Sequence, residues 1–357
     1  MSPTTTISPT TALPVELWDT VIDFCHSDRE SLLSCSLVRK SWIPCARLHL
    51  FELMGPVELF LEASDDPDIS LLLESPRCTI GPYLTQLRVG FLIYDPDKRA
   101  ERQERFWRIL TSTSGLALES LQLDILFPLS TSKAFTAATS TLTSLKIHGC
   151  IGRVSDASCR VRQVLELISS MRRLENLELS IESVRDLSSP ILPEVGDVAT
   201  TTILSLPRLR TLSLREPSTF NAVLPWLSVP DMIQLPNLSR VELHMADAAI
   251  PNVHVIQLFL DTACSLTVQE MYFKLMWTSF PALDLSRFQA LHSVEFHAIS
   301  PPAPPATPDI LIHIAETIYT RSKGTPVQIR YASAGLDFSP PRLSGVEWVK
   351  LSDDAGC

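Results

Sequence analysis

Residues 160–179, RVRQVLELISSMRRLENLEL, contain two hydrophobic periods in succession. In the first part, Val161, Leu165 and Ile168 recur at intervals of four and three residues, which is typical of a helix with one buried face. In LENLEL, which begins at Leu174, the period changes to two, so the fourth and sixth residues of this phrase should point inward from a strand. The stretch therefore predicts a helix followed by a β-strand.

The strand phrase L-x-x-L-x-L recurs along the chain. Further copies are LTQLRV, LESLQL, LTSLKI, LRTLSL and LSRVEL, at residues 84, 118, 142, 209 and 238. Looser copies begin at 268, 291 and 346, and another, VQIRY, lies around Val327. Between copies lie segments whose apolar residues recur at helical spacing, in residues 102–110, 255–264 and 309–321. A repeated unit of strand, turn and helix is the sequence signature of a solenoid.

From about residue 81 onward the chain resembles an irregular leucine-rich-repeat solenoid. The resemblance implies a parallel sheet on the inner curve and helices outside. That family usually places Asn or Cys eight residues after the first leucine, and here Cys150 fits, whereas Glu182, Pro217 and Ala246 stand at the equivalent places. We therefore expect irregular curvature. An ordinary α/β domain whose strands share the phrase is the alternative.

In such a solenoid the residues between the inward positions form rows on the inner curve. These rows are polar and mixed in charge, which suits a protein or peptide partner better than an apolar small molecule. A merely solvated sheet face is the competing interpretation. The candidate target-binding residues are Lys146, Glu178, Arg215, Arg240, Glu242, Tyr272 and Lys274.

Residues 13–51, LPVELWDTVIDFCHSDRESLLSCSLVRKSWIPCARLHLF, read as three short helices. Pro14 suits a first helical turn, Ser27 and Glu30 form an S-x-x-E capping box for a second helix, and Pro44 should break or kink the chain after Trp42. A segment of about 40 residues seldom holds a core alone. We therefore expect these helices to need a partner for their apolar faces.

LPVEL, from Leu13, and CSLVRKSW, from Cys35, resemble the F-box family, here of the fungal type. F-boxes dock on the Skp-type adaptor of cullin-RING ubiquitin ligases, so the resemblance implies such an adaptor as partner. The alternative is that the helices only cap the first turn of the larger domain. The resemblance implies that the adaptor-facing patch or its support is formed by Leu13, Pro14, Leu17, Ile22, Leu33, Leu37, Val38 and Trp42.

Composition narrows the function classes. The chain of 357 residues is 45% hydrophobic, which allows a large core, and its net charge of −10 disfavours nucleic-acid binding. No apolar run reaches the roughly 18 residues of a transmembrane helix, so no membrane association is expected. MSPTTTISPTTA lacks the features of a secretory signal, so we expect a cytoplasmic or nuclear protein.

Catalytic and metal-binding patterns are not found in the sequence. Phosphate-loop, H-E-x-x-H, G-x-S-x-G and glycine-rich dinucleotide motifs are missing. The eight cysteines include no C-x-x-C pair, and we identify no metal-ligand spacing among the histidines. We therefore expect neither an enzyme, which is the least favoured alternative, nor a cofactor or metal site.

Together these patterns predict an α/β protein in four parts. Residues 1–12 are expected to be a disordered leader, 13–55 a three-helix F-box-like module, 56–80 a helical connector, and 81–357 an irregular leucine-rich-repeat solenoid with a hairpin-like C-terminal cap. The resemblances imply a substrate-recognition subunit of a cullin-RING (SCF-type) ligase, which acts by proximity. A non-catalytic interaction scaffold is the alternative.

Overall fold

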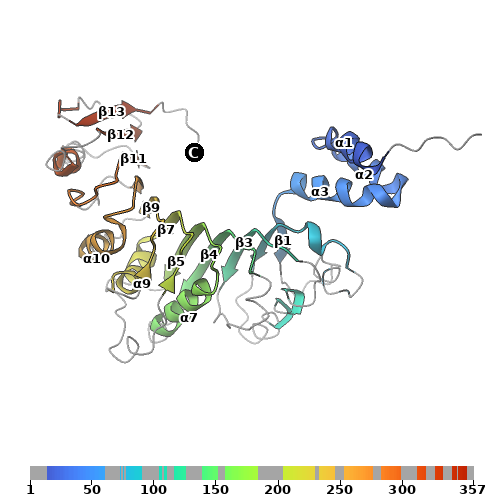
Figure 1. The fold of residues 1–357 in the computed structure, drawn as a ribbon. Coiled ribbons are helices and arrows are strands. Elements are labelled where there is room, and N and C mark those ends of the chain that lie inside the picture. Colours follow the sequence, from blue (N-terminus) through green and yellow to red (C-terminus); the bar gives the residue numbers. More distant parts are fainter. Residues whose placement is uncertain are drawn as a thin grey trace, which may run out of the picture.

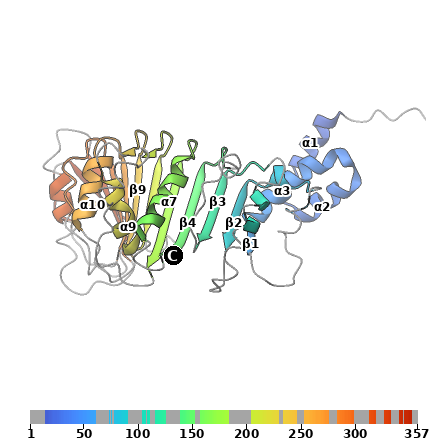
Figure 2. The same cartoon turned by 90° about the horizontal axis from the view of Figure 1, so that it is seen from below.

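The computed structural model shows an α/β fold with one large parallel sheet (Figures 1 and 2). It describes residues 14–60, 73, 75, 78–90, 104–106, 108–110, 116–125, 139–151, 157–183, 204–229, 233–245, 253–275, 283–298, 312–318, 326–332, 340–343 and 345–351. The predicted leader, Leu13 and the proline-rich residues 300–308 lie outside this set.

Eleven strands pair in the order β1-β2-β3-β4-β5-β7-β9-β10-β11-β12-β13, and every pair is parallel. They are β1 Val57–Phe60, β2 Gln86–Gly90, β3 Ser120–Ile125, β4 Ser144–Ile151, β5 Asn176–Ser183, β7 Thr211–Arg215, β9 Arg240–Met245, β10 Glu270–Leu275, β11 Ser293–Ala298, β12 Val327–Ala332 and β13 Val346–Lys350. A second sheet pairs β6 Leu204–Ser205 with β8 Ile233–Gln234.

The strand register follows the repeated phrase. Leu145, Leu177 and Leu212, each the fourth residue of its copy, are partners in neighbouring strands. From β2 to β11, the fourth and sixth positions that the phrase predicts to point inward are buried. In β12 the buried residues are instead Val327, Ile329 and Tyr331. Because neighbouring strands keep the same phase, the leucine rows form one continuous core.

Helices cover one side of the sheet. The predicted helix in residues 160–171 is confirmed as α7 (Ala157–Ser169), and the next helices are α9 (Pro217–Leu227) and α10 (Val253–Phe259), which continues into the π-helical turn η4 (Leu260–Cys264). Residues 104–106, 108–110 and 312–318 are also helical, as expected. The strands follow an arc with these helices on its outer side (Figure 1). The polar residues that alternate with the buried positions of each strand therefore face the inner curve of the arc.

The N-terminal helices form a module with its own core. Ile22, Leu32, Ala46 and Leu50 are buried together, separately from the core of the sheet. The elements are α1 Val15–Asp23, α2 Arg29–Val38, the 3-10 turn η1 Lys40–Trp42, and α3 Ile43–Met54.

Helix α3 connects this module to the first strands. The ring of Phe51 stacks on Tyr83, in the 3-10 turn η2 (Gly81–Tyr83), with ring centroids 6.5 Å apart. Arg47 donates a hydrogen bond to the Thr79 hydroxyl at 2.8 Å.

The prediction of a helical connector over residues 56–80 is wrong at its start. Val57–Phe60 is strand β1, and Val57 and Leu59 pair with Leu87 and Val89. Met54-x-x-Val57-x-Leu59 fits the repeated phrase with Met and Val in place of leucine, so this copy was missed. Gly55, with a φ of 68°, separates α3 from β1 in a conformation that glycine adopts without steric cost.

The predicted hairpin-like cap is also wrong, because β12 and β13 are parallel. In addition, the predicted inward positions of the phrase VEWVKL, counted from Val346, are shifted by one residue from the positions that pair with buried residues of β12. Trp348, not Val349, is the partner of the buried Ile329. A shift of one residue exchanges the two faces of a strand. The bulky Trp348 ring packs edge-on against Tyr331, which fixes the observed phase.

Two helix starts differ from the prediction. Asp28, rather than Ser27, caps α2, because its carboxylate accepts hydrogen bonds from the backbone N–H groups of Glu30 and Ser31. Pro44 is the second residue of α3 and does not break a helix. It lies in the first turn, where its missing N–H has no intrahelical acceptor to lose.

Candidate protein-interaction surfaces

The helical module exposes more large apolar side chains than it buries. Among the described residues, ten large hydrophobic side chains are exposed, and eight of them lie in this module. Phe24 and Leu37 are 81% and 87% exposed. A solvent-facing surface seldom keeps such a concentration unless it binds something. The eight are Leu17, Val21, Phe24, Leu33, Leu37, Val38, Leu48 and Leu53, and we call them the apolar surface of the module.

Five of the eight predicted adaptor-binding residues are exposed, namely Pro14, Leu17, Leu33, Leu37 and Val38. Ile22 is instead 1% exposed and belongs to the core of the module, where it can only support a surface. Trp42 is partly buried, with its ring centroid 4.6 Å from that of Trp18.

The sequence-based set omits Val21 and Phe24. Both lie on the face of Leu17, four and seven residues further along the chain, and both are exposed. Helical spacing by itself could have added them to the predicted surface. The omission arose because the F-box resemblance, rather than the spacing, selected the candidate residues.

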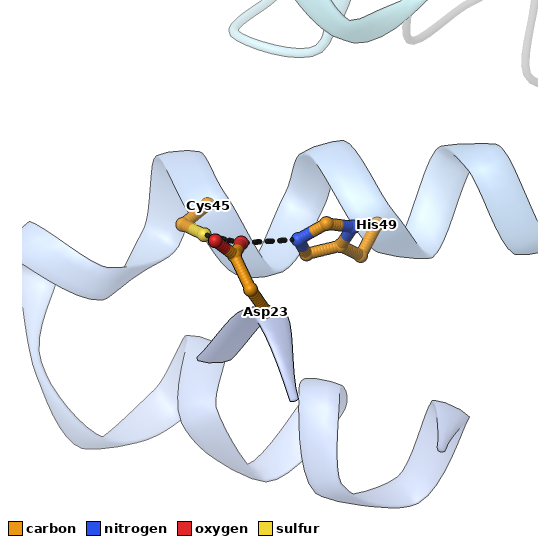
Figure 3. Close-up of side chains that lie close together, drawn as sticks. All are labelled: Asp23, Cys45 and His49. Atoms are coloured by element: carbon orange, nitrogen blue, oxygen red, sulfur yellow. Dashed lines mark hydrogen bonds and ion pairs between the residues drawn. The ribbon is translucent and has the colours of Figure 1, made fainter. Parts of the chain in front are cut away.

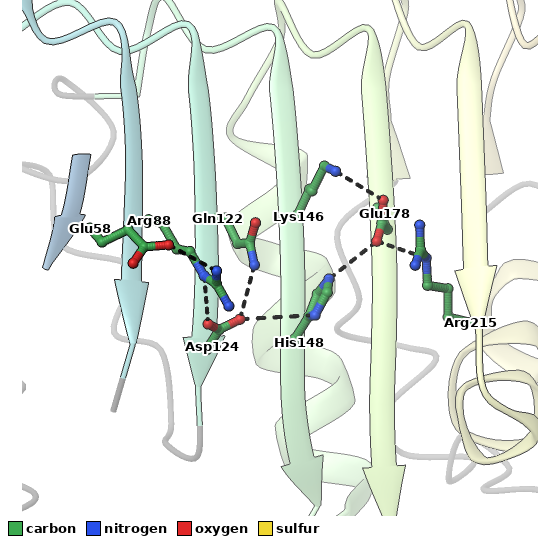
Figure 4. A network of polar contacts seen from close by, with 8 residues as sticks. All are labelled: Glu58, Arg88, Gln122, Asp124, Lys146, His148, Glu178 and Arg215. Carbon is green, nitrogen blue, oxygen red and sulfur yellow. Dashed lines mark hydrogen bonds and ion pairs between the residues drawn. The ribbon is translucent and has the colours of Figure 1, made fainter. Parts of the chain in front are cut away.

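The inner face of the sheet carries a chain of ion pairs across neighbouring strands (Figure 4). Arg88 on β2 lies 3.0 Å from Glu58 on β1 and 3.1 Å from Asp124 on β3. His148 on β4 lies between the carboxylates of Asp124, at 3.9 Å, and Glu178, at 3.2 Å. Because the strands are in register, these contacts join charges that are far apart in the sequence.

Glu178 on β5 is the centre of this first network. Its carboxylate lies 3.5 Å from Lys146 Nζ and 2.8 Å from Arg215 Nε, the latter as an ion pair without hydrogen-bond alignment. Burial alone would raise the pKa of Glu178, but His148, Arg215 and Lys146 outweigh it and hold the pKa below its usual value. Glu178 therefore stays ionised and is engaged by cations of this same chain.

A second network continues along β9 and β10. Arg240 contacts Glu242 at 2.8 Å and Glu270 at 3.0 Å. The Tyr272 ring lies between the rings of His244 and His297, with centroids 5.4 and 5.0 Å away. The Arg240 guanidinium is 5.9 Å from the Tyr272 centroid, within the range of a cation–π contact. Tyr272 is thus held in one orientation on the inner face.

Comparison with known proteins adds no family to this picture. No family model and no curated protein matches the chain. The assignment of a function therefore depends on the residues and surfaces of this chain.

The seven predicted target-binding residues are divided by these contacts. Glu178 and Glu242 are engaged in internal ion pairs, with side chains 12% and 21% exposed. Lys274 is exposed, whereas the partly exposed Lys146, Arg215, Arg240 and Tyr272 surround or adjoin the two carboxylates. Around Glu178 and Glu242 the inner face therefore offers cations and the Tyr272 ring, whereas Glu58 and Glu270 are as exposed as the arginines that they contact.

The described residues also form a hollow that is open to solvent. Its volume is about 430 Å³, and it lies where β5, β7 and β9 begin, lined by Glu175, Arg208, Arg210, Asn237 and Ser239. None of the described helices combines the length and apolar composition needed to cross a bilayer.

Replacing Glu242 by glutamine should destabilise the fold by about 1 to 3 kcal/mol at pH 7. Neighbouring His244 and then Arg240, against the effect of burial, lower the pKa of Glu242 to about 2. The His244 contact is long, at 3.5 Å, so we expect Arg240 to contribute most. With a lowered folded-state pKa, the stabilisation is present above the unfolded-state value of 4.5 and is lost as the pH falls towards about 2.

Urea unfolding of wild type and Glu242→Gln at pH 7, 4 and 3 measures this effect. The difference between the two proteins should shrink as the pH falls. Glu270→Gln is the matched control, because Glu270 contacts the same arginine from a more exposed position and should cost less than about 0.5 kcal/mol. A pH-independent difference for Glu242→Gln would contradict the assigned role.

Proposed function

We propose that this chain is a substrate-recognition subunit of a cullin-RING ubiquitin ligase of the SCF type. In this proposal residues 13–55 act as an F-box that binds a Skp-type adaptor, and the sheet acts as a leucine-rich-repeat solenoid that binds a protein target. The observation that carries the proposal is the apolar surface of the module, on the same helices whose sequence resembles an F-box.

Energetics support a partner for this surface. Among the described side chains of the module, those buried in its own core are Ile22, Leu32, Ala46 and Leu50. Full burial of an aliphatic or aromatic side chain contributes about 1.5 to 3 kcal/mol, so covering even part of the apolar surface would release substantial free energy. A partner with a complementary apolar groove fits this surface better than a charged ligand does.

The arrangement of the two parts also supports the proposal. Figure 1 shows the module at one end of the curved sheet, where α3 leads directly into β1. A partner on α1 and α2 would therefore leave the inner face accessible. The expected role in ubiquitin transfer is to hold a target near the catalytic subunits, which raises its effective concentration without a reacting group in this chain.

The proposed target surface is the inner face around Lys146, Arg215, Arg240, Tyr272 and Lys274. Tyrosine and arginine are common among residues that dominate binding energy at protein interfaces. The side chains of Lys146 and Arg215 already face Glu178, and that of Arg240 faces Glu242, so the surface is ordered before a target binds. This ordering favours a partner that supplies carboxylates of its own to the exposed side of the cations.

Binding of a purified Skp-type adaptor to the full chain tests the proposal. Wild type should bind the adaptor with 1:1 stoichiometry in calorimetry. The double variant Leu17→Asp/Leu37→Asp should bind at least about 100-fold more weakly, because two buried apolar contacts become unpaired charges. Both side chains are exposed in the free chain, so the far-ultraviolet circular dichroism spectrum should not change.

Leu266→Asp is the matched control. Leu266 is 72% exposed but lies after η4, far along the sheet from the module, so its replacement should leave adaptor binding unchanged. A wild-type chain that does not bind the adaptor would overturn the proposed function. Equal binding by wild type and the double variant would show that the apolar surface is not the docking site.

A further inference from the structure

Three side chains with metal-ligating atoms meet where α1 ends against α3. Asp23 is the last residue of α1, and Cys45 and His49 lie one turn apart on α3. Asp23 Oδ1 is 2.8 Å from His49 Nε2 and 3.4 Å from Cys45 Sγ, and all three ligand atoms lie within 4.8 Å of one another. Figure 3 shows the thiol and the imidazole on either side of the Asp23 carboxylate.

The spacing explains why these atoms converge. Residues four apart in a helix share one face, so Cys45 and His49 both point towards α1. This C-x-x-x-H spacing supplies two ligands from one helix without a C-x-x-C pair. The third ligand comes from a residue 22 positions earlier than Cys45 and is found only through the packing of α1 on α3.

The ligand atoms are separated by 2.8 Å, 3.4 Å and at most 4.8 Å, a range that includes the separations of a tetrahedral zinc site. Zinc bonds of about 2.0 to 2.3 Å place neighbouring ligand atoms about 3.3 to 3.8 Å apart. Small rotations of the exposed Asp23 side chain and of Cys45 would therefore suffice. The other imidazole nitrogen, His49 Nδ1, is 3.1 Å from Glu52 Oε2. A carboxylate in that place fixes the ring so that Nε2 faces the ligand position.

We propose that Asp23, Cys45 and His49 bind one Zn²⁺ ion, with water as the fourth ligand, and that this ion joins the end of α1 to α3. The combination of thiolate, imidazole and carboxylate favours zinc over magnesium or calcium, which prefer oxygen ligands alone. On binding, the Cys45 thiol loses its proton to solvent and the thiolate sulfur bonds to the ion. The site does not depend on the proposed function.

The charge state of the cluster agrees with this arrangement. The His49 ring, and then the Cys45 thiol, hold the pKa of the Asp23 carboxyl below its usual value. Burial, and then the nearby Asp23 carboxylate, raise the pKa of Cys45 to about 12, so the thiol keeps its proton until a cation displaces it. The small core of the module gives such a cross-link between helices a structural use, as in other small metal-stabilised modules.

Titration of the untagged full chain with Co²⁺, followed by competition with Zn²⁺, tests the site. Wild type should bind one Co²⁺ per chain with a thiolate-to-metal charge-transfer band in the near ultraviolet. Zn²⁺ should then abolish this band. Cys45→Ser should lose the band, and its affinity should fall by at least about 100-fold, more than is typical when an outer-shell partner is removed.

Two further variants keep the result interpretable if Cys45→Ser folds poorly. Asp23→Asn preserves the shape of an exposed side chain and should weaken binding at least about 10-fold while keeping the charge-transfer band. Cys35→Ser removes a partly buried cysteine of the same module and should behave as wild type. Failure to bind Co²⁺ at 1:1, a spectrum without thiolate character, or equal losses in Cys35→Ser and Cys45→Ser would overturn the site.

Discussion

Replacing Phe273 by alanine is expected to lower the free energy of unfolding by about 3 to 5 kcal/mol, the usual cost of removing a buried aromatic side chain. Phe273 is 1% exposed and stacks on Phe296 of the next strand, with centroids 5.1 Å apart and an angle of 11° between the rings. The substitution leaves a cavity between β10 and β11 and removes this stacking contact. Urea unfolding followed by circular dichroism measures the loss.

Lys274→Ala is the matched control, because the neighbouring residue on β10 points to the opposite face and is exposed. Its effect should stay within about 0.5 kcal/mol. Similar losses for the two variants would mean that the strand does not bury the face that carries Phe273. This pair of variants therefore tests the register of the sheet directly.

Replacing Ile22 by alanine is expected to destabilise the helical module by about 2 to 5 kcal/mol. Among the residues whose burial the structure describes, the core of the module consists of four buried apolar residues, so a cavity at one of them removes a large part of that core. The sheet has a separate core and should remain folded. We expect hydrogen exchange to become fast in residues 14–54 of the full chain and to be unchanged in β3 to β11.

The adjacent Val21→Ala is the control, since Val21 is 47% exposed on the same helix and its truncation should change exchange little. The result would be contradicted if the two variants behaved alike, or if Ile22→Ala accelerated exchange throughout the sheet. In the latter case the two cores would unfold as one unit.

The repeated strand phrase allowed much of the sheet to be predicted. Its fourth and sixth positions are the buried ones from β2 to β11, because a period of two in a strand fixes which face is apolar. The exceptions were copies with unusual residues. Met54, before β1, and Val57, its first residue, replace leucine. In β13 aromatic packing of Trp348 selects a phase that leucine counting did not predict.

The candidate surfaces were predictable to a smaller extent. The apolar faces of α1 and α2 follow from helical spacing, and five predicted residues are exposed as expected. No pattern in the sequence indicated that Glu178 and Glu242 would be enclosed by Arg215 and Arg240. The ion pair of Glu178 with Arg215 joins residues on neighbouring strands that are far apart in the sequence. The ion pair of Glu242 with Arg240 lies within one strand and depends on the side-chain conformations.

The sequence alone determined the period of each segment, and thereby a chain of alternating helices and strands with an apolar excess near its amino end. Only the tertiary structure decided that α1 packs on α3 so that Asp23 meets Cys45 and His49, and that Ile22 is enclosed while Val21 is not. The physical reason is that periodicity fixes the direction in which a side chain points along its own element, whereas the partner that it meets depends on how separate elements pack together.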